Sequence, residues 1–282
     1  MDCKASATRE DLEFILLNED AQPKPLPLSL LADITSDFSD KNIIGRGGFG
    51  IVYKGFIGNR TVAVKRLLRV LHFDEDGFYR EIKCLMKVKH QNVVRFLGYC
   101  NETRGEMAGF NGTLVMAQEE ERLLCFQYLS KGGLNNYINA DASSALEWEQ
   151  CYRIINGVCQ GLHQLHQHNI LHMDLKPENI LLGNDMVPKI ADFGLSRRLH
   201  EDQSYVITKN LCGTRGYMAP EFIDSNPENR AITKKCDLYS LGVIIMELLT
   251  GTREQCAVND VLDSWISRLG ESKTKSRTGT AG

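Results

Sequence analysis

The residues with the clearest chemical meaning are polar side chains in the second half of the chain. Asp174 and Asn179 lie five positions apart in a segment that contains a proline, and Asp192 follows a short apolar run. A carboxylate in such a loop can orient a hydroxyl nucleophile and accept its proton. Carboxylate and amide oxygens also suit Mg²⁺, which takes few protein ligands and keeps its phosphates and waters. The pattern favours a site for a magnesium-bound nucleotide.

A glycine-rich segment in the first half has the spacing of a phosphate-binding loop. Gly45, Gly47 and Gly50 follow the pattern G-x-G-x-x-G-x-V. Without Cβ atoms, the backbone N–H groups of such a loop can approach phosphates closely. Dinucleotide-binding proteins have the same glycine pattern, but in them a helix follows the glycines. Residues 51–53 are typical of a strand, so we expect a phosphate-binding hairpin, with a ligand-free glycine hairpin as the alternative.

Lys65 ends the run Val-Ala-Val-Lys, which is typical of a buried strand. Burying an ammonium group costs free energy unless the group is paired. Glu81, on a predicted helix, is a candidate partner, and the pair could aim Lys65 at phosphate oxygens. The alternative is a lysine at a strand end that reaches solvent.

The hydrophobic pattern divides the chain into two halves. Residues 41–101 are rich in β-branched and aromatic runs, which predict strands, and one helix is expected around Phe78, Ile82 and Leu85. After about residue 130 the pattern is helical, with predicted helices over 147–168 and 237–249. The second of these is apolar nearly all round, which predicts burial on every side. Strands before helices, without βαβ alternation, predict an α+β fold with a cleft between its halves.

Three other segments have distinct patterns. Prolines at positions 23, 25 and 27 predict an extended linker without regular structure, and the apolar run at 12–17 predicts a docking turn. Residues 102–121 are expected to form a long inserted loop. The polar residues 273–282 predict a disordered tail.

Composition excludes several classes of protein. The hydrophobic share of 43% and charged share of 24% are ordinary globular values, and a net charge of −3 gives no nucleic-acid footprint. Nine irregularly spaced cysteines without a Cys-x-x-Cys pair indicate reduced thiols and no zinc site. No apolar run approaches the ~18 residues of a membrane span, and no signal peptide is evident. We therefore expect a cytoplasmic protein without a membrane span or nucleic-acid partner.

Taken together, the motifs resemble those of eukaryotic protein kinases, and most closely the cytoplasmic kinase domains of plant receptor-like kinases. They occur in the family's order over about residues 42–255, and comprise the glycine loop, the strand lysine, the helix glutamate, the catalytic loop His172–Asn179, Asp192-Phe193-Gly194 and Ala219-Pro220-Glu221. The resemblance implies a two-lobed α+β fold. Its expected parts are a leader over 1–41, an N-lobe over 42–129, an incomplete C-lobe over 130–270 and a polar tail over 271–282.

The resemblance also implies roles for single residues, with ATP and Mg²⁺ as ligands. Asp174 would be the catalytic base, and Lys176 would contact the γ-phosphate, as in serine/threonine kinases. Thr214 in the substrate-binding loop supports the same class. Asn179 and Asp192 would bind Mg²⁺.

The nucleotide-binding residues follow from the same resemblance. Gly45, Gly47 and Gly50 would cover the phosphates, and Lys65, held by Glu81, would bind the α- and β-phosphates. The implied adenine contacts are Val52, Ala63, Gln127, Leu129 and Leu181, beside a gatekeeper at Phe126. Core packing is the alternative for these apolar side chains.

The sequence departs from the family in two places. Met173 replaces an arginine that pairs with activation-loop phosphates in many kinases, so phosphorylation of that loop is expected to change activity only weakly. Family members also continue for several helices after the predicted helix at 237–249. Here only a short helix at 261–266 is expected, so we predict a truncated C-lobe that lacks its last helices.

We therefore expect a serine/threonine protein kinase that acts on protein substrates in receptor-like signalling, with receptor or membrane-associated partners. A cytoplasmic location is expected, and a peripheral place at the plasma membrane is the alternative, although Cys3 alone would anchor the chain weakly. A pseudokinase or scaffold is the rival function because of the missing helices. A dinucleotide-dependent oxidoreductase is a third, opposed by the strand after Gly50.

Overall fold

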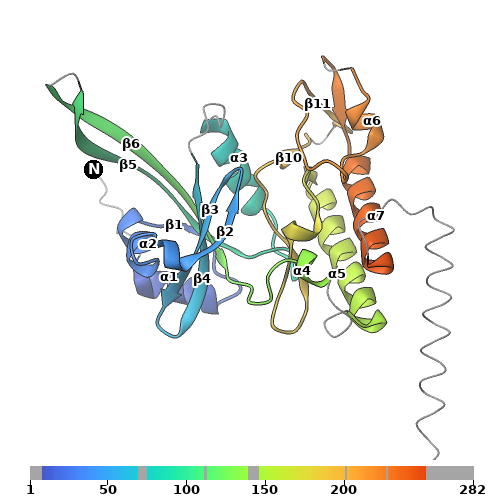
Figure 1. Cartoon of the computed structure of the whole chain (residues 1–282), viewed down its shortest axis with the longest axis horizontal. Helices are drawn as coiled ribbons and strands as arrows, with labels where there is room; N and C mark the ends of the chain where they lie inside the picture. The colour runs from blue at the N-terminus through green and yellow to red at the C-terminus, as the bar shows by residue number, and fades with distance from the viewer. Residues whose placement is uncertain are drawn as a thin grey trace, which may run out of the picture. The chain divides into compact units, whose positions relative to one another are not determined.

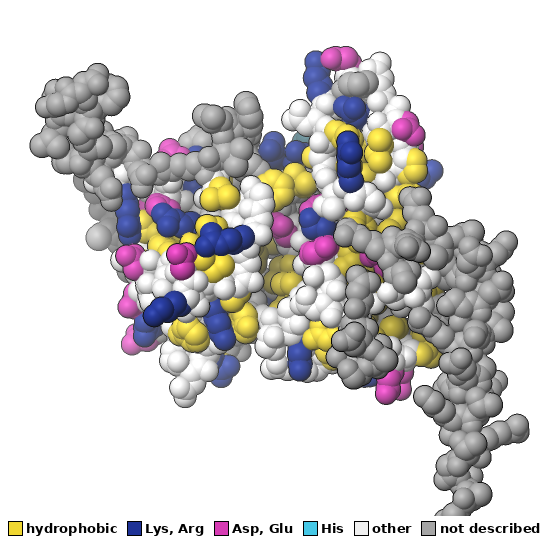
Figure 2. All heavy atoms as spheres, viewed as in Figure 1, with side chains coloured by type: hydrophobic (Ala, Val, Ile, Leu, Met, Phe, Trp, Pro, Cys, Tyr) yellow, Lys and Arg dark blue, Asp and Glu magenta, His cyan; other side chains and the backbone are white. Residues whose placement is uncertain are grey.

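The computed structural model describes residues 8–68, 75–110, 113–138, 146–200, 202–226 and 228–251. The chain forms two compact units, Met1–Leu129 and Ser130–Gly282. The first unit is built on a β-sheet, and the second is dominated by helices (Figure 1). This composition confirms the predicted α+β class. On the face in Figure 2, basic and acidic side chains are interspersed over the described surface.

The first unit contains a six-stranded sheet in the order β1-β5-β6-β4-β3-β2. Its strands are β1 (Lys24–Pro25), β2 (Ile43–Gly47), β3 (Gly50–Ile57), β4 (Arg60–Leu67), β5 (Phe96–Phe110) and β6 (Thr113–Gln127). A 3₁₀ turn (η1, Asp40–Asn42) leads into β2, and α3 (Glu75–Leu85) is the helix predicted from its apolar spacing. Gly58, at a φ of +54°, lies in the turn between β3 and β4.

The predicted loop over residues 102–121 was wrong. β5 and β6 continue as an antiparallel ribbon, in register from Asn101 opposite Arg122 to Phe110 opposite Thr113. Figure 1 shows this green ribbon extending beyond the other strands of the sheet. The sequence near the base of the ribbon is polar and lacks the alternation that indicates a strand. The ribbon forms there because backbone hydrogen bonds, which do not depend on side-chain type, extend the existing hairpin.

The N-terminal segment is more regular than predicted, because the run at 12–17 lies in a helix and not in a docking turn, and residues 24–25 of the extended linker form β1. Helix α1 (Arg9–Leu17) begins at a capping box, in which the Thr8 hydroxyl accepts from the Asp11 N–H and the Asp11 carboxylate accepts from the Thr8 N–H. Helix α2 (Leu28–Ile34) follows Pro27. The prolines do keep the intervening chain extended, since β1 pairs in parallel with Gly98 and Tyr99 of β5.

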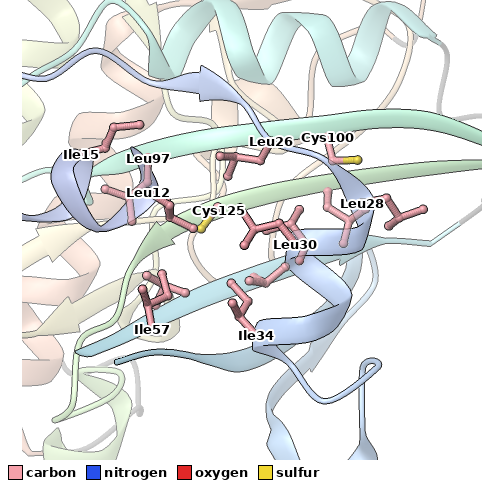
Figure 3. Close-up of a cluster of buried hydrophobic side chains, with 14 residues drawn as sticks. Leu12, Ile15, Leu26, Leu28, Leu30, Ile34, Ile57, Leu97, Cys100 and Cys125 are labelled. Carbon is pink, nitrogen blue, oxygen red and sulfur yellow. The ribbon is translucent and has the colours of Figure 1, made fainter. Parts of the chain in front are cut away.

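Apolar side chains of α1 and α2 form one core cluster with the sheet (Figure 3). The cluster comprises Leu12, Ile15, Leu26, Leu28, Leu30, Leu31, Ile34, Ile57, Val62, Val64, Leu97, Cys100, Leu123 and Cys125. Burying one such large aliphatic side chain stabilises a fold by about 1.5–3 kcal/mol. The helices form because their leucines and isoleucines find this apolar face, which the sequence pattern alone does not reveal.

Helices α5 (Trp148–Gln167) and α7 (Lys234–Thr250) are the long elements of the second unit. Shorter elements are α4 (Asn135–Ile138), η2 (Pro177–Asn179) and α6 (Pro220–Ile223), with strand pairs β7 (Ile170–Leu171) and β10 (Arg197–Arg198), β8 (Ile180–Leu182) and β9 (Pro188–Ile190), and β11 (Val206–Thr208) and β12 (Arg230–Ile232). Both predicted helices are confirmed. No helix in the described part of the chain is long and apolar enough to cross a membrane.

Helix α7 is buried on one face only, so the prediction of burial on every side was wrong. Leu241 and Ile244 are buried, whereas Leu238 is 52% exposed. The helix ends at Gly251, whose φ of 70° and N–H bond to the Glu247 carbonyl form a left-handed cap. The helix predicted at 261–266 and the tail at 271–282 lie outside the described residues.

Replacing Gly98 with alanine is expected to weaken the attachment of β1. A Cβ at position 98 would collide with the Lys24 carbonyl oxygen and lie 2.8 Å from the Leu26 side chain. We expect the free energy of unfolding to fall by about 2 kcal/mol in urea titrations. The control is Gly242→Ala in α7, where a Cβ meets no described heavy atom within 4 Å and should stabilise by up to about 1 kcal/mol. Equal effects of the two variants would contradict the close approach at Gly98.

The buried Cys125 thiol is expected to make the free energy of unfolding depend on pH. Burial raises the pKa of this thiol to about 12, whereas an unfolded thiol titrates near 9. Above pH 9 the unfolded chain therefore releases a proton that the folded chain retains. Stability from this group should fall by about 1.4 kcal/mol per pH unit between pH 9 and 12. Urea titrations of the protein and its Cys125→Val variant over pH 8–10.5 measure the difference, and parallel pH profiles would refute it.

Candidate functional site

The glycine-rich segment of the first unit forms the hairpin between β2 and β3. Gly45 pairs with Val52, and Gly47 pairs with Gly50. A Cβ at Gly47 would meet no described heavy atom within 4 Å, so its backbone is open to a ligand. A Cβ at Gly50 would lie 2.5 Å from the Arg66 carbonyl oxygen, so this glycine is needed for contact with β4. Because a strand and not a helix follows, the dinucleotide-binding alternative was wrong.

Lys65 of β4 and Glu81 of α3 form a buried ion pair. The Lys65 Nζ lies 3.2 Å from the Glu81 Oε1, and the two side chains are only 9% and 1% exposed. The alternative of a lysine that reaches solvent was therefore wrong. The glutamate offsets the cost of burying the ammonium group, and it fixes the direction in which that group points.

The residues implied as adenine contacts are distributed over both units. Val52 and Ala63 lie half-buried on β3 and β4, Gln127 ends β6, and Leu129 follows it. Leu181 lies half-buried on β8 in the second unit. Phe126, the implied gatekeeper, packs against Phe96 with ring centroids 5.5 Å apart. This ring contact is the core packing that the sequence left open as an alternative for Phe126.

Asp174 is the centre of a polar cluster in the second unit. Its Oδ1 accepts a hydrogen bond from the Thr214 hydroxyl at 2.6 Å, and its Oδ2 lies 3.0 Å from the Lys176 Nζ. Lys176 also donates to the Thr214 hydroxyl at 2.8 Å. The carboxylate thus has a hydroxyl on one oxygen and a positive charge on the other. This arrangement can hold a hydroxyl group, accept its proton and neutralise nearby negative charge.

Asn179 connects Asp174 with the segment that carries Asp192. Its Nδ2 donates to the Asp174 backbone oxygen at 2.8 Å and to the Asp174 Oδ2 at 3.1 Å, so the amide nitrogen is the atom that engages Asp174. The Asn179 backbone oxygen accepts from the Ala191 N–H at 2.8 Å. Asp192 has a left-handed backbone with a φ of 63°. Among the described residues no group of three or more His, Cys, Asp or Glu is arranged to hold a metal ion.

Asp237 of α7 holds the segment before Asp174 through contacts that the sequence analysis missed. Its two carboxylate oxygens accept from the N–H groups of His172 at 2.9 Å and Met173 at 2.8 Å, and the His166 Nε2 lies 2.9 Å away. This buried carboxylate fixes the backbone that leads into Asp174. The available signal was an acidic residue in a largely apolar helix, since such a residue needs partners inside the fold.

His172 orders the same loop through its ring. The Nε2 lies 2.9 Å from the Ala191 carbonyl oxygen, to which it donates, and the Nδ1 accepts from the Asp174 N–H at 3.3 Å. These two contacts fit the tautomer that carries a proton on Nε2. The ring also makes an edge contact with Phe193, with centroids 5.2 Å apart.

Met173 lies in an apolar cluster between the catalytic loop and the following segments. The cluster contains Leu171, Met173, Leu199, Ala219, Phe222, Ile232 and Cys236. Cys212 and Cys236 line a small cavity beside Met173. Burial raises the pKa of both thiols, so they are neutral and poor nucleophiles. Met173 attaches these segments by apolar contact and offers no charge to a phosphate.

Comparison with known proteins identifies related sequences. The protein kinase domain family matches residues 38–269. Cysteine-rich receptor-like protein kinase 38 of Arabidopsis thaliana is 39% identical over 227 residues, which cover 79% of this chain and 32% of that protein. Receptor-like serine/threonine-protein kinase SD1-7 of the same plant is 35% identical over 243 residues, which cover 84% and 26%.

A third relative gives a similar result. Cysteine-rich receptor-like protein kinase 7 of Arabidopsis thaliana is 40% identical over 224 residues, or 78% of this chain and 31% of that protein. The aligned part of the chain thus spans between about a quarter and a third of the length of these curated relatives.

Replacing Met173 with arginine is expected to destabilise the second unit. The new guanidinium would lie in the apolar cluster, so we expect the free energy of unfolding to fall by about 2 kcal/mol in urea titrations. The control is Met86→Arg, at a position that is 46% exposed, where the change should stay within about 0.5 kcal/mol. A Met173→Arg variant as stable as the control would contradict the apolar role of Met173.

Proposed function

The chain belongs to the protein kinase family, and from that premise we propose that it transfers the γ-phosphate of ATP to serine or threonine hydroxyls of protein substrates. Relatives named as receptor-like kinases, one of them a serine/threonine kinase, support this class. They confirm the resemblance to plant receptor-like kinases.

The observation that carries the proposal is the hydroxyl already bound at Asp174. The Thr214 hydroxyl donates to the Asp174 Oδ1 at 2.6 Å, so this oxygen has the geometry that a hydroxyl nucleophile requires. We propose that a substrate serine or threonine binds there and gives its proton to Asp174. Its oxygen forms the new bond to the γ-phosphorus, the bond to the bridging oxygen of ADP breaks, and ADP leaves with that electron pair.

Lys176 supplies positive charge to the same reaction. Its Nζ lies 3.0 Å from the Asp174 Oδ2 and 2.8 Å from the Thr214 hydroxyl. We propose that this ammonium group contacts the γ-phosphate and stabilises the negative charge on its oxygens during transfer. The loop geometry needed for this is held by Asp237 through the backbone of His172 and Met173.

The nucleotide is proposed to bind through residues of each unit. In the first unit, Gly45, Gly47 and Gly50 would donate backbone N–H groups to phosphates, and Lys65 would contact the α- and β-phosphates. The open space at Gly47 and the buried Glu81 partner of Lys65 support these roles. The proposed adenine contacts are Val52, Ala63, Gln127, Leu129 and Leu181.

Protein kinase domains use ATP with a divalent metal ion, and we propose Mg²⁺ for this chain. Asn179 and Asp192 present oxygen ligands of the kind that this cation prefers. The Nδ2 of Asn179 is committed to Asp174, which leaves its Oδ1 as the atom that could coordinate. The ion would neutralise phosphate charge when bound.

The biological setting is proposed from the relatives alone. The printed names of the relatives are those of receptor-like kinases. We propose that this chain acts in receptor-like signalling on protein substrates in the cytoplasm, at or near the plasma membrane, with receptor or membrane-associated partners.

Replacing Asp174 with asparagine tests the proposal. Asparagine keeps the size of the side chain but cannot accept the proton, so we expect phosphate transfer to fall by about 10²–10⁴-fold while ATP binding is kept. Transfer from labelled ATP with Mg²⁺ is measured on a serine- and threonine-containing peptide, followed by phosphoamino-acid analysis. The matched control is Asp185→Asn, an exposed carboxylate in the same unit, which should retain full activity.

Two outcomes would contradict the proposal. Transfer that survives in the Asp174→Asn variant would remove Asp174 from the reaction. Alternatively, a folded unchanged protein that binds ATP but transfers no phosphate would favour the nucleotide-binding scaffold.

A further inference from the structure

The N-terminal segment, residues 8–38, is attached to the sheet by polar contacts as well as by its core cluster. The Arg95 guanidinium donates to the carbonyl oxygens of Ile15, Leu16 and Asn18 at the end of α1. The Glu102 carboxylate accepts from the Leu28 N–H at 2.8 Å, where Pro27 offers no side-chain cap to α2. The C-terminal end of α1 and the N-terminal end of α2 are therefore held by side chains that follow α3 in sequence.

The segment ends in an unusual turn. Ser36, Asp37 and Phe38 have φ values of 56°, 54° and 54°, a left-handed conformation that residues other than glycine rarely adopt. The Asp37 N–H donates to the Ala32 carbonyl at 2.7 Å, and the Phe38 N–H donates to the Thr35 hydroxyl at 3.2 Å. The surrounding contacts thus impose a backbone that the residues do not favour by themselves.

The turn places the Phe38 ring in contact with two residues of the sheet. The ring makes an edge contact with Tyr53 of β3, with centroids 5.5 Å apart, and it lies 4.9 Å from the Arg66 guanidinium. Arg66 also donates from its Nε to the Glu121 Oε2 at 2.8 Å, and its Nη2 donates to the Oε1. Glu121 is buried on β6. Arg66 is therefore held between an aromatic face and a carboxylate.

Arg66 occupies a central position in the proposed nucleotide site. It follows Lys65 on β4, and its carbonyl oxygen is the atom that a Cβ at Gly50 would approach to 2.5 Å. A shift of β4 at Arg66 would therefore move both the Lys65 ammonium group and the end of the glycine hairpin. Tyr53, the other contact of Phe38, pairs with Val64 beside Lys65 and with Ile43 at the start of β2.

We infer that Phe38 is a positioning residue for ATP, which acts through Arg66 on Lys65 and the glycine hairpin. This inference rests on the proposed function. Phe38 touches neither nucleotide nor substrate in this account. It keeps β4 in the one position where the ammonium group and the hairpin suit the same phosphates.

Replacing Phe38 with alanine tests the inference. Losing the ring's contact with the guanidinium is expected to raise the dissociation constant of ATP and its KM by about three- to fivefold, with the KM for a peptide substrate unchanged. Phe38→Tyr keeps the aromatic face and should restore ATP binding. The control is Phe14→Ala on α1 of the same segment, where the ring is 58% exposed, and ATP binding should remain unchanged.

A purely structural role is separated by measuring ATP binding well below the melting temperature, at an equal folded fraction by circular dichroism. If Phe38→Ala does not fold, Phe38→Leu keeps apolar volume without the aromatic face and should show the same weakened ATP binding. Unchanged ATP affinity in the folded variants would overturn the inference while the proposed function stands. Absence of ATP binding by the unchanged protein would overturn the proposed function and the inference with it.

Discussion

A carboxylate buried in an apolar helix must find partners inside the fold, and in the second unit this constraint organises the catalytic loop. Asp237 meets it with two backbone N–H groups and His166, which fixes the chain just before Asp174. Two further polar residues on α7 act in the same way. Ser240 donates to the Tyr217 carbonyl at 2.6 Å, and the Tyr217 hydroxyl donates to Glu247 at 2.9 Å. One helix thereby holds both the catalytic loop and the segment that follows Thr214.

In the first unit, charged side chains of the sheet are stabilised by pairing with groups of opposite charge. Lys65 and Glu81 are buried together, and Arg66 on the next position is paired with Glu121. Breaking the buried Lys65–Glu81 pair would leave an uncompensated charge, which destabilises a fold by about 3–5 kcal/mol. Because Lys65 and Arg66 are adjacent on β4 and each has its own partner, a shift of β4 would separate both pairs. The N-terminal segment adds to that placement through Phe38 and the apolar core.

The sequence predicted those parts of the site whose chemistry resides in the residue types. Lys65 needs a buried partner, and Asp174 and Asn179 are close in sequence, so their contacts could be anticipated. The N-terminal helices could not, because a short apolar run such as that at 12–17 fits a turn equally well until its tertiary partner is known. The β5–β6 ribbon was missed for a related reason, since its strands are fixed by hydrogen bonding along an existing hairpin. The role of Asp237 depends on contacts 64 and 65 residues away in sequence, which no local pattern contains.

The apolar surroundings of Met173 determine how the attachment of the catalytic loop responds to salt and to temperature. An arginine–phosphate contact weakens as salt screens it, whereas an apolar contact is insensitive to moderate ionic strength. Apolar contacts weaken on cooling, because burial of apolar surface is driven by water entropy near room temperature. The attachment of the catalytic loop to its neighbours should therefore tolerate changes in cellular ion content and loosen in the cold. Temperature, more than electrolyte, would then set how well ordered this loop is.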